Sequence, residues 1–305
     1  MKILQEISRS MIGRRGGLIG QRDVWVSRSR ASRNQKYKGV LFRHFPELLN
    51  DYLHQWTVQL ITSHIGEKDK NILDIGCGYG RLSIPIRGKY PDTLLVGLDI
   101  SPYYAKEYIS QVQNGFAILS DSLLLPFKKG GFHIVFEVFS LMYLPDKRSY
   151  RQAIQEMLYA LSDKGSMLVV ENNRAGTFFL NGLGLFTLLS KFTAEKKSEA
   201  PEGLIFSGHE IDLMVHQNGG VVTKKCGMPL FTLFIPFNIL LSFVSSKLLR
   251  KILSVIRYLD PVFQFLNFLS LYHFYWIKKR EADVYHSQTP DRNALNAPAA
   301  GTPVQ

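Results

Sequence analysis

A short apolar run that contains an acid and is followed by three glycines constrains this chain more than any other stretch. Residues 71–75 read Asn-Ile-Leu-Asp-Ile, and glycines follow at positions 76, 78 and 80. A buried parallel strand has an apolar run of this kind, bounded by turn signals. Glycines without a Cβ let a ligand approach the backbone of a turn that opens a helix. The stretch predicts the first strand–turn–helix unit of a doubly wound sheet, whose ligands bind beyond the carboxyl ends of the strands.

The spacing of the glycines indicates which ligand this turn accepts. Dinucleotide-binding enzymes use G-x-G-x-x-G, in which the helix N-terminus faces a pyrophosphate. Here Asp74 is followed by Gly76, Gly78 and Gly80, which departs from that template. The pattern resembles motif I of the class I S-adenosylmethionine (SAM) methyltransferases, of the type found in ubiquinone and menaquinone methyltransferases. The resemblance implies SAM as the cofactor, with these four residues and Cys77 around it.

A second predicted strand that ends near an acid follows at the distance that this resemblance requires. Residues 93–100 form an apolar run in which Asp99 comes 25 residues after Asp74. A carboxylate at the end of the second strand can accept hydrogen bonds from both ribose hydroxyls. The alternative is an acid that merely precedes the next helix, which is expected to begin near Ser101. In the first interpretation Ile100 lies against the adenine ring.

A third short strand, residues 116–121, also ends in an acid. The resemblance implies that Asp121 meets the exocyclic amine of adenine and that the backbone N–H at Ser122 meets a ring nitrogen. Residues 124–136 then resemble the family's loop of the type L-P-F-x-x-x-x-F-D-x-V. The resemblance therefore extends over roughly residues 45–172, with its landmarks in the expected order.

The chain departs from the family pattern around the fourth strand. His133 stands where the family usually has Asp, and we interpret it as a hydrogen-bonded structural residue. Met142 and Tyr143 replace histidines that many relatives carry, so no histidine base can be transferred to this chain. Tyr143 is a weak catalytic candidate that could orient a substrate oxygen, with packing as the alternative. Residues 137–143, together with the insertion at about 231–268, are expected to line the acceptor pocket, and Glu137 is expected to contribute to the cofactor site.

The remaining pattern predicts an α/β, Rossmann-like, doubly wound sheet of seven mostly parallel strands. An apolar helical insertion at about 231–268 separates the last two strands, which are expected at 219–225 and 272–279. The predicted organisation is a flexible basic arm at 1–36, a methyltransferase domain at 37–286 with its SAM-binding core at 45–172, and a disordered tail at 287–305.

Charge and cysteine content limit the location and partners of the chain. The formal charge is +12, and residues 1–40 hold ten Lys and Arg against two acids. Such an arm suits nucleic acid or an anionic membrane surface, and an Arg- and Ser-rich leader could instead be an organelle transit peptide. Only Cys77 and Cys226 are present, which excludes a disulfide framework or a cysteine metal cluster and favours a cytoplasmic, reducing location.

The insertion has the composition of a membrane-surface element. Residues 226–246 carry no charge, and residues 258–277 carry only Asp260. Between them, Lys and Arg recur at helical spacing. Apolar helices lying in the membrane interface, with cations toward anionic headgroups, fit this pattern. The alternatives are a lid or dimer surface buried within protein, and a true membrane span, against which Pro229 and Pro236 argue.

These features predict a SAM-dependent methyltransferase that acts on a small-molecule or lipid-like acceptor as a peripheral membrane protein. One alternative is an RNA or protein methyltransferase that uses the basic arm. The [D/N]-P-P-[Y/F] signature of enzymes that methylate exocyclic base amines is absent, which makes nucleic acid a less favoured partner. Another alternative is a non-catalytic SAM-binding or assembly protein. No metal site is expected.

Overall fold

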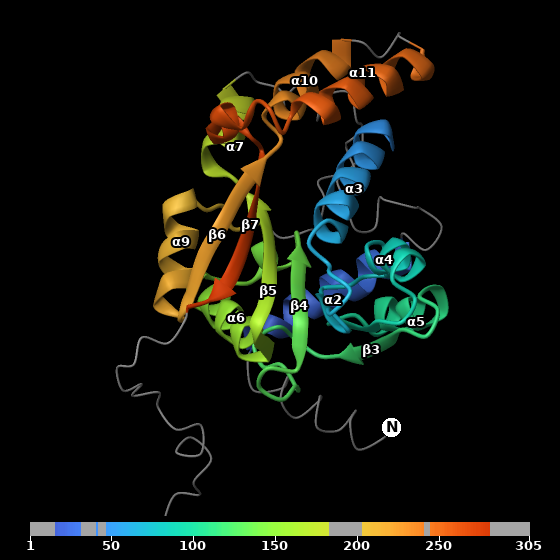
Figure 1. Cartoon of the computed structure of the whole chain (residues 1–305), viewed down its shortest axis with the longest axis vertical. Helices are drawn as coiled ribbons and strands as arrows, with labels where there is room; N and C mark the ends of the chain where they lie inside the picture. Colours follow the sequence, from blue (N-terminus) through green and yellow to red (C-terminus); the bar gives the residue numbers. More distant parts are fainter. Residues whose placement is uncertain (1–15, 32–40, 42–46, 183–202, 241–244, 281–305) are drawn as a thin grey trace, which may run out of the picture.

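The computed structural model describes residues 16–31, 41, 47–182, 203–240 and 245–280. A single sheet in the order β3-β2-β1-β4-β5-β7-β6 runs through the molecule (Figure 1). Strand β7 is antiparallel to both of its neighbours, and the other described pairs are parallel. The strands are β1 (Asn71–Ile75), β2 (Leu94–Asp99), β3 (Phe116–Leu119), β4 (Phe132–Val138), β5 (Leu161–Asn172), β6 (Gly220–Gly227) and β7 (Tyr272–Lys279). The predicted Rossmann-like, mostly parallel seven-stranded sheet is confirmed.

Helices cover both faces of this sheet because successive side chains of a strand point to opposite sides. Ile72 belongs to the core beneath α3 and α4, whereas Leu73, the next residue, belongs to the core beneath α6 and α9. Both residues are fully buried. The helices are α2 (Gly16–Ala31), α3 (Glu47–Thr62), α4 (Ser83–Lys89), α5 (Pro102–Gln111), α6 (Lys147–Ala160), α7 (Arg174–Gly182), α9 (Gly208–Gln217), α10 (Pro229–Leu240) and α11 (Ser246–Leu259), with 3-10 turns η1 (Leu141–Tyr143) and η2 (Gln264–Leu269).

The helix starts follow from polar side chains that satisfy free backbone N–H groups. Ser101 caps α5 and Asp146 caps α6, each accepting a hydrogen bond from a first-turn N–H. Ser207 and Glu210 form a capping box at α9. At the start of the sheet, His133 accepts a hydrogen bond of 3.2 Å from the backbone N–H of Asn71 through its Nδ1. His133 is therefore a structural residue, as its sequence context predicts.

The apolar insertion predicted between the last two strands is present as α10, α11 and η2. These elements lie beyond the carboxyl ends of β4 and β5, next to α3 (Figure 1). The rings of Tyr52 in α3 and Phe231 in α10 stack at 4.5 Å. The Tyr52 hydroxyl donates a 2.7 Å hydrogen bond to Asp260, the residue that follows α11. In the part of the chain that the structure describes, no helix combines the length and apolarity needed to cross a membrane.

The prediction of a flexible arm over residues 1–36 is wrong for residues 16–31, which form α2. This helix packs on α5 because its polar side chains find specific partners there. The hydroxyls of Ser29 and Ser101 lie 3.0 Å apart, and Arg30 both stacks on Tyr103 and donates to its hydroxyl. Residues 1–15 and 32–36 of the predicted arm, and the predicted tail at 287–305, lie outside the described residues.

Candidate functional site

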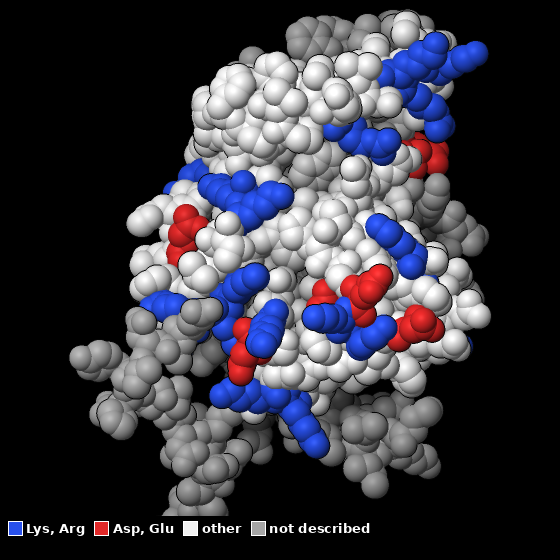
Figure 2. All heavy atoms as spheres, in the orientation of Figure 1, with Lys and Arg blue, Asp and Glu red and all other residues white. Residues whose placement is uncertain are grey.

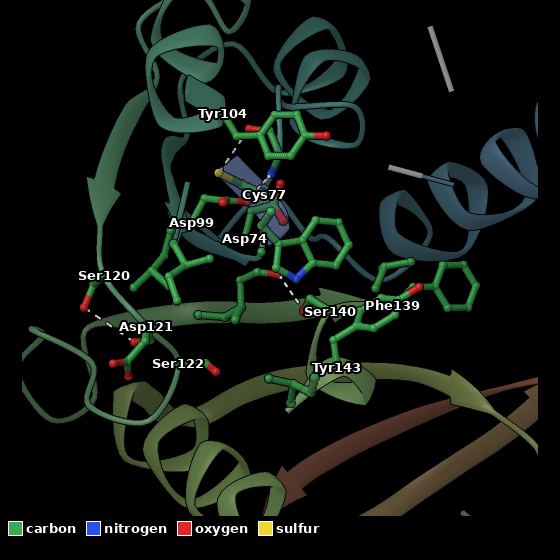
Figure 3. Close-up of a pocket in the computed structure, with 18 of the residues that line it drawn as sticks. Asp74, Cys77, Asp99, Tyr104, Ser120, Asp121, Ser122, Phe139, Ser140 and Tyr143 are labelled. Atoms are coloured by element: carbon green, nitrogen blue, oxygen red, sulfur yellow. Dashed lines mark hydrogen bonds between the residues drawn. The ribbon is translucent and has the colours of Figure 1, made fainter. Parts of the chain in front are cut away.

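A cleft opens at the carboxyl ends of β1, β2 and β4, with α2 over it. This is the edge at which ligands of doubly wound sheets bind. Figure 3 shows side chains from both halves of the sheet pointing into it. The lining residues are Trp25, Asp74, Ile75, Gly76, Cys77, Gly78, Arg81, Leu82, Leu98, Asp99, Ile100, Tyr104, Ser120, Asp121, Ser122, Val138, Phe139, Ser140, Leu141, Tyr143 and Leu144.

The glycine turn after β1 uses backbone conformations that side chains rarely adopt. Gly76, Gly78 and Gly80 have φ angles of +68°, +54° and +92°. A Cβ at Gly76 would run into Ser140, so the turn and the segment after β4 approach each other only because this position is glycine. Gly80 does not line the cleft. A Cβ there would meet Val112, so this glycine permits the packing of the turn on α5.

Asp99 joins the second strand to the glycine turn. Its Oδ2 accepts a 2.9 Å hydrogen bond from the backbone N–H of Gly78, and its Oδ1 accepts one of 2.8 Å from Ser101. Burial raises the pKa of this carboxyl to about 6, against the opposing effect of these two hydrogen bonds. Asp99 therefore has a fixed orientation in the wall of the cleft, with lone pairs left for a ligand.

Asp74 braces the end of β1 against α4. Its Oδ2 accepts a 2.8 Å hydrogen bond from the hydroxyl of Ser83, which in turn accepts one of 3.0 Å from Tyr108. Burial is the main cause that raises the pKa of Asp74 to about 7. The side chain also lines the cleft, so one carboxyl group serves both the packing of the turn and the cavity surface.

Asp121 and Ser122 lie at the end of the cleft formed by the segment after β3, with Ser120 beside them (Figure 3). Asp121 Oδ1 accepts a 2.8 Å hydrogen bond from the backbone N–H of Leu123, which fixes the loop. Ile100 lines the same cavity from the end of β2. The structure thus brings Asp74, Asp99 and Asp121, from three successive strand ends, into one cleft.

Glu137 is the one predicted acid that lies outside the lining of the cleft. Its carboxylate is fully buried and accepts hydrogen bonds from the backbone N–H groups of Ser140, Leu141 and Val170, and from the Ser140 hydroxyl. Burial raises its pKa to about 7. These contacts assign Glu137 to shaping the turn that carries η1 rather than to ligand contact, which corrects its predicted place among the cofactor residues.

Tyr143 lines the cleft from η1, opposite α2. Its ring meets the ring of Trp25 edge to face, with centroids 5.0 Å apart and planes at 71°. Burial raises the pKa of the Tyr143 hydroxyl. This residue is therefore a neutral phenol in an aromatic corner of the cavity at ordinary pH.

The geometry of this cleft accompanies clear similarities to known proteins. A protein-family model described as a methyltransferase domain matches residues 72–165. Residues 72–165 are therefore similar to methyltransferase domains, and they lie on a Rossmann-like sheet. Ajmaline N-methyltransferase of Rauvolfia serpentina is 27% identical over 112 residues, which are 35% of this chain and 37% of that protein.

A second curated relative and a solved structure are also similar to parts of this chain. The tRNA (guanine-N(7)-)-methyltransferase of Aspergillus niger is 40% identical over 57 residues, 19% of this chain and 18% of that protein. The crystal structure of magnesium protoporphyrin IX methyltransferase from Synechocystis has a TM-score of 0.54 at 15% identity, over 85% of this chain and 98% of that chain. The chain thus spans less than half the length of the two curated relatives, and the similarity to the crystal structure concerns the fold.

SAM is the cofactor that the methyltransferase domain indicates, and the residues of the cleft suit it. SAM carries a sulfonium and an ammonium cation, a carboxylate and two ribose hydroxyls. The lining offers three carboxylates as acceptors and the guanidinium of Arg81 as a donor. Gly78 presents backbone without a Cβ in the same wall. The polar groups of the lining therefore fit a cofactor that carries positive charge near its reacting centre.

Several residues that line the cleft were not predicted, among them Trp25, Arg81 and Tyr104. Trp25 is the one aromatic residue within residues 1–36, which is the signal that could have identified it. Arg81 directly follows the glycine turn and is buried, with its guanidinium 3.1 Å from His54 Nδ1. Tyr104 lies in α5, whose approach to the cleft depends on tertiary packing.

Proposed function

We propose that the chain transfers a methyl group from SAM to a small-molecule or lipid-like acceptor. The observation that carries this proposal is the convergence of Asp74, Asp99 and Asp121 with the glycine turn in one cleft whose opposite wall is apolar. The acidic side suits the cofactor, and the apolar side suits an acceptor with little charge.

We propose the cofactor roles that the family resemblance implies, for residues that line the cleft. We assign the glycine turn at 76–78 to the methionine part and the ribose, and Asp99 to the ribose hydroxyls. We assign Arg81, which lines the cleft and also contacts His54, to the cofactor's carboxylate. We place the adenine ring against Ile100 and its amine at Asp121, with the backbone N–H of Ser122 at a ring nitrogen.

The acceptor end of the cleft is formed by Trp25, Phe139, Tyr143 and Leu144. When bound, SAM supplies the methyl carbon and the sulfur leaving group. The chain's contribution is to hold the acceptor in line with that carbon and to exclude water, which can account for about 7–11 kcal/mol of barrier lowering. A base is required only for an acceptor that is hard to deprotonate, so the site works without a histidine. We propose Tyr143 as a positioning residue that presents its hydroxyl to an acceptor oxygen or nitrogen.

The relatives support the acceptor class to different extents. Ajmaline N-methyltransferase is named for a small-molecule acceptor and matches 112 residues. The tRNA methyltransferase matches only 57 residues, and the wall opposite the acids of the present cleft is aromatic and aliphatic rather than cationic. We therefore favour the small-molecule or lipid-like acceptor over RNA, and we place its delivery at a membrane surface because of the insertion.

The test is incubation of the full chain with SAM labelled in its methyl group and with fractionated cell extract. We expect label in the lipid or small-metabolite fraction with the wild-type chain and none with Asp99→Ala. Label in RNA or protein would reject the proposed acceptor class. Tight SAM binding without label in any fraction would instead support a non-catalytic SAM-binding protein.

A further inference from the structure

The insertion carries an exposed apolar face that the fold does not use. We define the aromatic face as Phe178 of α7, Val255 and Tyr258 of α11, and Val262, Phe265 and Phe268 in and before η2. These side chains are 57% to 79% exposed. Monomeric proteins rarely leave so many large apolar side chains together at the surface, and such patches mark interaction sites.

The members of this face come from elements that are packed together. Helix α7 lies against η2, and the side chain of Asn173, just before α7, donates a 2.9 Å hydrogen bond to the carbonyl of Phe268. The last turn of α11 is tied to the core because Asp260 accepts a hydrogen bond from Tyr52 and another from the backbone of Leu230. The aromatic face is therefore held on a fixed support.

Cations lie beside the aromatic face, and acids are absent from it. Lys247, Arg250 and Lys251 are exposed on α11. Across residues 229–271 the sequence contains a single acid, Asp260, which is buried. Figure 2 shows cations over α11 at the upper right and a broad uncharged surface to their left. An apolar surface with flanking Lys and Arg complements the headgroup layer of an anionic membrane.

The geometry points to a docking surface for an anionic phospholipid membrane, made by the aromatic face and the three cations of α11. The surface lies beyond the carboxyl ends of the strands, the end at which the cleft opens (Figure 1). A membrane bound there would supply a lipid-like acceptor on the side of the molecule that receives it. This inference deepens the proposed function and rests on it only for the identity of the acceptor.

Point variants test this surface better than removal of the insertion would. Phe231, Phe234, Leu249 and Leu253 of the insertion are buried in the core that α3 shares, so a deletion would also unfold that core. The first variant is Phe265→Ser with Phe268→Ser. The second is Lys247→Gln with Arg250→Gln and Lys251→Gln.

Matched controls remove similar side chains at other exposed positions. Ile109→Ser with Phe116→Ser removes two side chains that are 58% and 59% exposed on α5 and β3. Lys128→Gln with Lys129→Gln and Lys164→Gln removes three exposed cations elsewhere.

The experiment is flotation of the full chain with phosphatidylcholine vesicles, with and without phosphatidylserine. We expect binding that requires phosphatidylserine and falls as salt rises. The aromatic variant should bind the vesicles at least about tenfold more weakly than the wild type does. The affinity of the cation variant for these vesicles should fall about a hundredfold, at roughly fivefold for each cation. Most of the salt dependence of binding should be lost as well. Both control variants should bind as the wild type does.

Three results would overturn the inference. The aromatic variant could float as well as the wild type, or binding could vanish only when residues 1–15 are removed. In a third result the wild type forms a dimer in light scattering that these substitutions dissolve, which would make the face an interface between two copies. Calorimetry with SAM on every variant separates the proposals: loss of flotation with intact SAM affinity concerns the membrane surface alone, and absent SAM affinity in the wild type rejects the proposed function alone.

Discussion

The carboxylate of Asp99, at the end of β2, accepts a 2.9 Å hydrogen bond from the backbone N–H of Gly78 in the turn after β1. Two neighbouring strands are thereby joined at the point where we place the cofactor. The side chain that we assign to the ribose also holds the glycine turn in place. A substitution at this position should therefore change both cofactor affinity and the free energy of unfolding.

Asp99→Ala should weaken SAM binding, because two ribose hydrogen bonds to a charged acceptor are lost, at about 1.5–3 kcal/mol each. Titration calorimetry measures the affinity, and a thermal melt without SAM measures the structural part. Asp99→Asn keeps an oxygen that can accept from Gly78 and should melt closer to the wild type while still binding SAM weakly. Unchanged affinity in Asp99→Ala would reject the ribose assignment.

Gly76→Ala should lower both stability and SAM affinity. Its φ of +68° is unfavourable for alanine, and the new Cβ would collide with Ser140. We expect a loss of about 1–3 kcal/mol in unfolding free energy. Gly88→Ala is the control, because a Cβ there meets nothing within 4 Å, and it should be neutral or add about 0.4–1 kcal/mol. Urea titration measures the unfolding free energy of both variants. Equal losses of unfolding free energy in the two would refute this account of the turn.

Trp25→Ala should weaken SAM binding and leave the core of the fold intact. The indole closes the cleft against Tyr143, at a ring separation of 5.0 Å, and its removal admits water to the cofactor. We expect an affinity loss of roughly tenfold, which corresponds to about 1.4 kcal/mol. Ser27→Ala, an exposed position on the same helix, is the matched control. Calorimetry that gives both variants the wild-type affinity would remove α2 from the site.

Asp260 should make the stability of the chain depend on pH. Burial raises its pKa from 3.8 to about 6, so the folded state holds a proton in this range that the unfolded state releases. The free energy of unfolding should therefore fall as pH rises from about 3.8 to 6 and level off above that, by at most about 3 kcal/mol. Asp260→Asn, whose amide can still meet Tyr52 and the backbone of Leu230, should remove this part of the slope. Urea titrations at several pH values, in which both proteins have the same slope, would contradict the prediction.

The sheet and most of its cleft were predictable from the sequence, because buried strands appear in it as short apolar runs. The last strand was predicted at 272–279 and observed as Tyr272–Lys279. Asp74, Asp99 and Asp121 were predicted to share a site because carboxyl ends of parallel strands meet at one edge. The structure places all three in the same cleft.

Other parts of the site depend on tertiary contacts that have no local signal. Glu137 ends a strand much as Asp99 does, but its carboxylate turns inward to backbone donors that only the folded chain brings together. Helix α2 is rich in Arg and Ser and lacks a clear apolar stripe, so periodicity does not predict it. Its place over the cleft depends on contacts such as that between Ser29 and Ser101, 72 residues apart in the sequence.

The bond between Tyr52 and Asp260 joins residues that are 208 positions apart, and it sets an order for biosynthesis. Helix α3 leaves the ribosome early, but the aromatic and aliphatic residues of α10 and α11 that pack against it are translated much later. Until then the apolar face of α3 is exposed in the nascent chain and can bind chaperones. Chains truncated before α10 should accordingly be insoluble, even though they contain all of strands β1 to β5.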